Sequence, residues 1–146
     1  MGTTLPIFIS KQIERLEAVG IDQSLAEVEW ILCNILEVDR LEMYLTADEK
    51  LDDHARLRFE EVMLRREKRE PLQYILSESF FYGRKFFVSP AVMVPTPETE
   101  MLCQSAIGFV EDKEIERPKI LDLGVGSGVI SVTLACEIKT ATVMSV

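Results

Sequence analysis

Hydrophobic residues recur at helical spacing, with polar residues between them, through the first half of the chain. Between residues 5 and 19, leucine and isoleucine recur every three or four positions, which predicts an amphipathic helix that Gly20 ends. Asp22 and Ser24 favour a helix start, so a second helix is predicted to open there. Its hydrophobic stripe consists of Leu25, Val28, Leu32, Ile35 and Leu36.

Two further helices are predicted from the same pattern. Asp39 is a suitable N-cap for the short segment DRLEMYL, and a longer helix begins around Asp52. The apolar face of this longer helix consists of Ala55, Phe59, Val62 and Met63. Pro71 ends it, because the residue before a proline is pushed out of the helical region. Residues 1–70 are therefore predicted to form a small helical bundle, and they contain no catalytic constellation.

The pattern after Pro71 is typical of β-structure. The segment SESFFYGRKFFVSP has aromatic and β-branched residues on both sides of Tyr82-Gly83. This arrangement predicts a β-hairpin with strands at 79–82 and 84–88. We assign residues 71–95 to a hairpin linker.

The stretch VPTPETE has the residues of a helix start. Thr96 precedes a proline and fits the N-cap, where its hydroxyl can accept an amide bond. Pro97 fits the first helical position, and Glu98 and Glu100 favour the positive end of the helix. The predicted helix runs to about residue 110, and its apolar positions are Met101, Leu102, Ala106, Ile107 and Val110.

The segment KILDLGVGSGVISVTLACEI predicts a strand, a glycine turn and a helix, and ATVMSV begins another strand. This order is the first unit of a doubly wound parallel sheet. One such unit cannot bury both faces of a parallel sheet. We therefore expect residues 96–146 to be the incomplete start of a larger domain that continues beyond Val146. The predicted fold class is α+β, with a helical bundle, a hairpin linker and a first β-α-β unit.

Composition narrows the function classes. The chain has 16 basic and 25 acidic residues, a net charge of -9 that disfavours nucleic-acid binding. One histidine and three scattered cysteines do not predict a metal site. The N-terminus lacks the features of a signal peptide, and no window is apolar enough to span a membrane. The odd cysteine count suits a reducing compartment, so we expect a cytoplasmic protein.

The glycine-rich stretch DLGVGSG is the most informative motif for chemistry. Its glycines allow a sharp turn at the strand end, and the amides that follow can hold polar or anionic ligand groups. Asp122 could bind a ligand ammonium or fix the loop itself. A dinucleotide fingerprint needs a glycine where Val129 stands, whereas the spacing present is that of S-adenosylmethionine-dependent methyltransferases. In either class, the ribose-binding carboxylate is expected about 20 residues after the glycines, at or just past Val146.

The order of these segments resembles a known family. A helical domain, then PLQYILSESFFYGRKFFVSPAVMVPTPETE, then ILDLGVGSG, is similar to the start of the HemK-type protein-glutamine methyltransferases that act on peptide chain release factors. The resemblance covers the whole chain and is strongest between residues 71 and 128. It implies a Rossmann-like methyltransferase domain and methyl transfer from S-adenosylmethionine to the glutamine amide of a release factor's Gly-Gly-Gln motif. The helical domain would help to bind the release factor.

The resemblance also implies site residues. The cofactor would be bound by Asp122, Gly124, Val125, Gly126, Ser127 and Gly128. Its pocket would be bordered by Thr96, Pro97, Glu98 and Glu100, and Thr96 stands where the family usually has arginine. The family's catalytic Asn-Pro-Pro-Tyr motif is expected beyond Val146, so we expect this chain alone to be inactive.

Two other hypotheses remain open at this stage. One is a helical module that binds a translation factor without catalysis, and the other is an NAD-dependent oxidoreductase. The basic residues around Arg65, Arg66, Lys68 and Arg69 fit a solvated surface laced with glutamates better than a partner contact.

Overall fold

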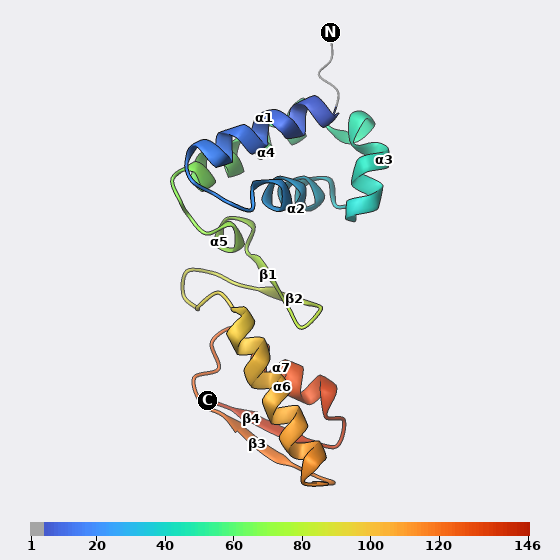
Figure 1. The fold of residues 1–146 in the computed structure, drawn as a ribbon, viewed down its shortest axis with the longest axis vertical. Helices are drawn as coiled ribbons and strands as arrows, with labels where there is room; N and C mark the ends of the chain where they lie inside the picture. The colour runs from blue at the N-terminus through green and yellow to red at the C-terminus, as the bar shows by residue number, and fades with distance from the viewer. Residues whose placement is uncertain (1–4) are drawn as a thin grey trace. The chain divides into compact units, whose positions relative to one another are not determined.

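The computed structural model describes residues 5–146, without the side chains of residues 47–50. The chain divides into two compact units, with the division between Leu76 and Ser77 (Figure 1). Each unit has its own hydrophobic core. The two are described separately below.

The first unit is a helical bundle. Its elements are α1 (Leu5–Ala18), α2 (Ser24–Leu36), α3 (Arg40–Lys50), α4 (Asp53–Glu67) and α5 (Leu72–Leu76). The predicted cap at Asp39 and the predicted helix start at Asp52 are confirmed, and Asp52 also caps its helix. The Asp39 carboxylate accepts the Glu42 amide at 2.8 Å, and the Asp52 carboxylate accepts the Ala55 amide at 2.7 Å. The first four helices were predicted from the sequence, whereas α5 was not.

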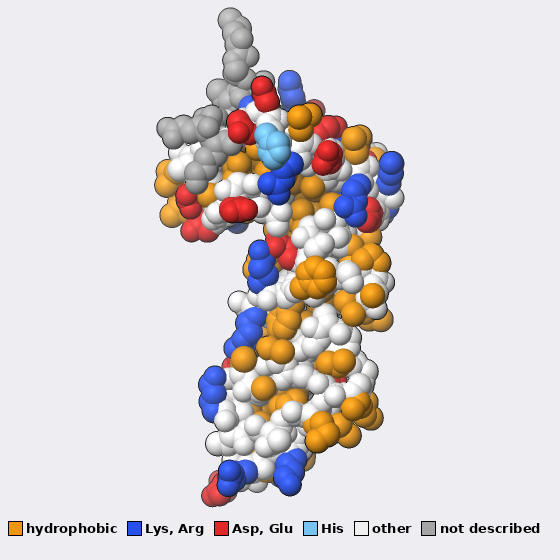
Figure 2. All heavy atoms as spheres, turned by 180° about the vertical axis from the view of Figure 1, so that it is seen from behind, with side chains coloured by type: hydrophobic (Ala, Val, Ile, Leu, Met, Phe, Trp, Pro, Cys, Tyr) orange, Lys and Arg blue, Asp and Glu red, His pale blue; other side chains and the backbone are white. Residues whose placement is uncertain are grey.

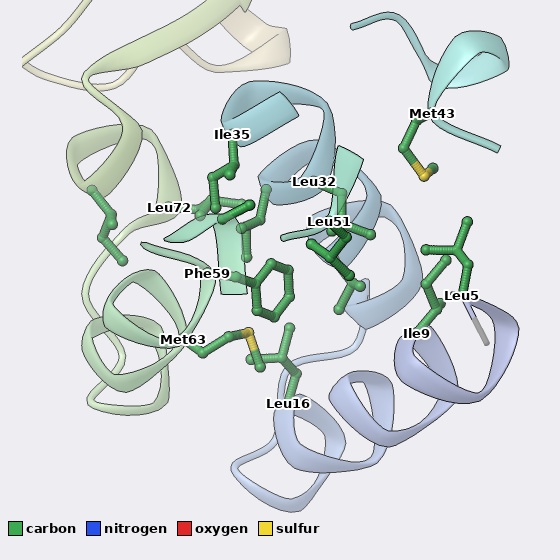
Figure 3. Packing of buried hydrophobic residues seen from close by; sticks show 14 of the residues in the cluster. Leu5, Ile9, Leu16, Leu32, Ile35, Met43, Leu51, Phe59, Met63 and Leu72 are labelled. Carbon is green, nitrogen blue, oxygen red and sulfur yellow. The ribbon is translucent and has the colours of Figure 1, made fainter. Parts of the chain in front are cut away.

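The core of this unit is formed around Phe59 of α4, which is 1% exposed (Figure 3). The Phe59 ring meets the Phe8 ring edge-on, with centroids 5.1 Å apart. The predicted stripe of α2 is wrong at its first position, because Leu25 is 46% exposed. Ser24 is buried in its place and donates to the Ile21 carbonyl at 3.2 Å, so it opens the helix without capping it. The remaining buried apolar residues of α2 are Val28, Ile31, Leu32 and Ile35.

Ion pairs join the helices of the first unit. Glu29 of α2 is buried, and its carboxylate accepts hydrogen bonds from Arg40 and Tyr44 of α3. Arg15 of α1 donates to Glu60 and Glu67 of α4 at 2.7 and 2.8 Å. These contacts fix α3 against α2, and α1 against α4.

Three basic residues of α4 and the turn after it, Arg65, Arg66 and Arg69, have partners within the unit. Arg66 pairs with Glu27 at 2.6 Å, and Arg65 pairs with Glu70. Arg69 donates to the backbone carbonyls of Val19 and Gly20 in the turn after α1. Figure 2 shows acidic and basic side chains interspersed on the visible face of this unit. Arg65, Lys68 and Arg69 are exposed, in line with the predicted solvated surface, whereas Arg66 is partly buried against Glu27.

The second unit combines a hairpin with a parallel β-α-β unit (Figure 1). Its elements are β1 (Glu78–Phe81), β2 (Arg84–Phe87), α6 (Pro97–Asp112), β3 (Lys119–Asp122), α7 (Val129–Glu137) and β4 (Thr142–Ser145). Strands β1 and β2 pair antiparallel, whereas β3 and β4 pair parallel. The predicted hairpin, helix and strand-helix-strand order are confirmed, and so is the α+β class.

The core of the second unit differs from the predicted pattern in α6. Met101 and Leu102 are 63% and 56% exposed, and Cys103 is the buried residue of this helix. Cys103 packs with Phe81 of the hairpin and with the residues of α7 that face α6. Burial, with the nearby Asp122 charge, raises the pKa of the Cys103 thiol. The hairpin therefore supplies part of the core that holds α6 and α7 together.

Candidate functional site

The glycine loop connects the end of β3 to the start of α7. Both ends of the loop are tied by backbone hydrogen bonds. Gly124 and Val125 donate to the Val146 carbonyl at 2.7 and 3.2 Å, and Gly128 donates to the Val125 carbonyl at 2.8 Å. The loop thus lies at the carboxyl end of the parallel strands, the edge where open α/β sheets bind ligands.

The three glycines of the loop have backbone angles that other residues adopt at a cost. Their φ values are +83° for Gly124, +52° for Gly126 and +79° for Gly128. A Cβ at Gly124 would meet no atom within 4 Å, and one at Gly126 or Gly128 would make only ordinary contacts. Glycine is therefore favoured here by the backbone conformation and not by lack of space. The space beside the loop is left open.

Several amides of the loop and of the first turn of α7 have no internal acceptor. Across the described residues, the amides of Gly126, Ser127, Val129 and Ile130 donate to no backbone carbonyl. Amides at the start of a helix carry partial positive charge. The loop can therefore bind an anionic or hydrogen-bond-accepting ligand group.

Asp122 is 9% exposed at the end of β3. Its carboxylate accepts a hydrogen bond from the Ser131 hydroxyl of α7 at 2.5 Å. Its backbone carbonyl accepts the Val146 amide at 3.0 Å. Asp122 thus connects β3 to α7 and to the chain after β4, and its contact with a ligand stays a prediction.

A pocket of about 170 Å³ lies between the glycine loop and the segment before α6. It is lined by Met93, Val94, Pro95, Thr99, Gly124, Val125, Gly126, Ser127, Val129 and Ile130. The structure thus brings VPTPETE to the glycine loop through Pro95 and Thr99. Six of the predicted site residues do not line this pocket. They are Asp122, Gly128, Thr96, Pro97, Glu98 and Glu100.

The polar residues of VPTPETE have other contacts. Thr96 is the extended N-cap residue of α6, but its hydroxyl does not cap an amide as predicted; it lies 3.5 Å from the Thr99 hydroxyl. Thr96 also hydrogen-bonds the Glu98 carboxylate, which lowers the pKa of Glu98. The Glu100 carboxylate accepts the Tyr82 amide of the hairpin at 2.6 Å, a contact that the sequence did not predict.

The described part of the chain has neither the features of a metal site nor those of a membrane-spanning helix. Residues 5–146 contain no group of three or more metal-ligating side chains placed to share an ion. No helix within that range is both long and apolar enough to cross a bilayer. A larger hollow of about 320 Å³ in the first unit lies between Arg58 and Arg65, over Ile35 and Ile75, and contains none of the predicted site residues.

Comparison with known proteins gives consistent results. Residues 9–76 match the family model described as the PrmC N-terminal domain. Proteins named release factor glutamine methyltransferase are similar along most of the chain. The one from Fusobacterium nucleatum is 38% identical over 144 residues, and the one from Nitratidesulfovibrio vulgaris is 39% identical over 124 residues. The one from Chlorobaculum tepidum is 34% identical over 146 residues.

The aligned region is only part of each relative. It covers 97%, 85% and 98% of this chain, but 40%, 41% and 47% of the three relatives. The chain therefore spans less than half of their length. The resemblance predicted from the sequence, to the N-terminal portion of this family, is confirmed.

Proposed function

From this similarity to the N-terminal portion of the release factor glutamine methyltransferases, we propose that the chain is the corresponding part of a longer enzyme. That enzyme transfers a methyl group from S-adenosylmethionine to the side-chain amide nitrogen of the glutamine in a release factor's Gly-Gly-Gln motif. A substrate of this kind places the activity in the cytoplasm. The single structural observation that best supports a cofactor site in this chain is the pocket between Pro95, Thr99 and the glycine loop.

The residues around this pocket fit a methionine-derived cofactor. Such a cofactor carries a carboxylate, an ammonium group and ribose hydroxyls, all of which need polar partners. The free amides of the loop suit a carboxylate or hydroxyl oxygen, and the carboxylate of Asp122 lies at the strand end beside them. A volume of about 170 Å³ is below the range of complete small-molecule pockets, roughly 300–1,000 Å³. The pocket is therefore proposed as one part of a site that the rest of the enzyme completes.

The reaction needs precise positioning. The amide nitrogen is a poor nucleophile because its lone pair is delocalised, so the enzyme must align it with the methyl group. When bound, the cofactor supplies an activated methyl group. The residues of this chain hold the donor: the loop amides bind its polar end, while Pro95 and Thr99 form the opposite wall. Acceptors for the amide protons are proposed to lie in the remainder of the enzyme.

Calorimetric titration of the full-length protein tests the cofactor class. We expect S-adenosylhomocysteine to bind and NAD to give no heat beyond dilution. Binding of NAD with no binding of S-adenosylhomocysteine would refute the proposal in favour of an oxidoreductase. Residues 1–76 are proposed to contact the release factor, and loss of release-factor binding on deleting them from the full-length protein checks this.

A further inference from the structure

The tip of the hairpin is attached to both helices that border the cofactor pocket. Tyr82 and Gly83 form a two-residue loop between the paired residues Phe81 and Arg84. Both loop residues have positive φ, +52° and +72°. The tight primed turn this implies is the usual one for a two-residue hairpin. It leaves the Tyr82 amide without a backbone acceptor among the described residues.

Glu100 supplies that acceptor from the first turn of α6. The Glu100 carboxylate receives the Tyr82 amide at 2.6 Å, a charge-assisted hydrogen bond across 18 positions of sequence. Glu98, two residues earlier, is exposed, and within the described part of the chain its interaction is with Thr96 of its own turn. The two glutamates of VPTPETE therefore have different roles, because Glu100 alone reaches another element.

A second contact joins the hairpin to α7. Arg84 pairs with Glu137, near the end of α7, at 2.6 Å. Between these two polar contacts, Phe81 is 1% exposed in the core that α6 and α7 share. Through these contacts the hairpin tip helps to hold α6 and α7, which also pack directly on one another.

The position of α6 relative to α7 also determines the shape of the pocket. Thr99 is in the first turn of α6, and Pro95 directly precedes the N-cap residue Thr96; Pro95 and Thr99 form one wall. The glycine loop and the start of α7 form the other wall. A hydrogen bond between the first turn of α6 and the hairpin, which also pairs with α7, therefore restrains one wall relative to the other.

We propose that Glu100 is a positioning residue for cofactor binding, which acts by holding the first turn of α6 to the hairpin tip and so keeps Pro95 and Thr99 against the glycine loop. This inference rests on the proposed function for the identity of the ligand. The tether itself does not depend on that identity. Glu100 does not line the pocket. Its substitution is therefore expected to change cofactor affinity and not the rate of the chemical step.

The test compares Glu100→Ala, Glu100→Gln and Glu111→Ala in the full-length protein. Glu111 is an exposed glutamate on the same helix whose carboxylate has no hydrogen bond or ion pair in the described range. For Glu100→Ala we expect about fivefold or greater weakening of S-adenosylhomocysteine binding, and a matching rise in KM for S-adenosylmethionine, with kcat and the KM for release factor unchanged. Glu100→Gln keeps an oxygen acceptor and is expected to restore binding to within about twofold.

Amide hydrogen exchange without ligand provides the second readout. Glu100→Ala should accelerate exchange at the Tyr82 amide and at the amides of Thr96, Glu98 and Thr99 beside the pocket wall, whereas Glu111→Ala should not. Unchanged affinity and unchanged wall exchange in Glu100→Ala would overturn the inference. If the wild-type protein binds no S-adenosylhomocysteine, the proposed function fails. In that case the exchange result alone tests whether Glu100 holds the first turn of α6 to the hairpin. If Glu100→Ala does not fold, Glu100→Gln is compared with a variant that lacks the acceptor but keeps the shape, Glu100→Met.

Discussion

Replacing Gly124 by alanine separates the backbone role of the glycine loop from its role beside a ligand. Gly124 has φ +83°, and an added Cβ would meet no protein atom within 4 Å. The substitution therefore costs only conformational strain, about 1–2 kcal/mol, reduced by the lower entropy of the unfolded chain to a net cost of about 1 kcal/mol. The new methyl group lies beside the pocket, where it would compete with a bound ligand.

The matched control is Gly20→Ala in the first unit. Gly20 has φ +75°, and its Cβ would meet only the flexible end of the Arg69 side chain, at 3.2 Å. Urea unfolding should give a loss of about 1 kcal/mol for Gly124→Ala and a loss at least as large for Gly20→Ala, because the Arg69 guanidinium, which donates to the Val19 and Gly20 carbonyls, must shift. Calorimetry of the full-length protein should show that Gly124→Ala binds S-adenosylhomocysteine about tenfold or more weakly, while Gly20→Ala binds it normally. Equal cofactor affinity in the two variants would refute the assignment of the loop as a ligand-binding surface.

Two further predictions concern the first unit. Phe59→Ala should destabilise it by about 3–5 kcal/mol in urea unfolding, because the ring is fully enclosed and packs on Phe8; a loss below about 1 kcal/mol would contradict this packing. The Arg15 guanidinium holds the pKa of Glu60 below its ordinary value of 4.5, so this pair contributes stability above that pH and loses it as the pH falls through the lowered pKa. Wild type should therefore exceed Glu60→Gln in stability at neutral pH, and the difference should vanish in acid; a difference that is independent of pH would show that the carboxylate charge does not matter.

The sequence predicted most of the elements because their signals are local. Asp39 and Asp52 begin helices whose amides they cap, and Tyr82-Gly83 forms the hairpin turn. The glycines of DLGVGSG occupy positive φ angles at a switch from strand to helix. Each of these features depends on residues within a few positions of one another, so the pattern alone is sufficient.

The features that the sequence did not predict depend on tertiary contacts. In α6, hydrophobicity alone favoured Met101 and Leu102, but Cys103 is the residue that faces Phe81 and α7. The short helix α5 has only five residues, too few for a periodic signal. The contact between Glu100 and the Tyr82 amide joins positions 18 apart. Spacing along the chain cannot predict such a bond, because it depends on how the hairpin packs on α6.

The most direct test of the proposed function is the mass of the substrate after reaction. Full-length protein is incubated with S-adenosylmethionine and a peptide chain release factor, and the peptide that contains the Gly-Gly-Gln motif is analysed by mass spectrometry. We predict the gain of one methyl group on the side chain of that glutamine. An unmodified glutamine, in a protein shown to bind S-adenosylhomocysteine, would contradict the proposed activity.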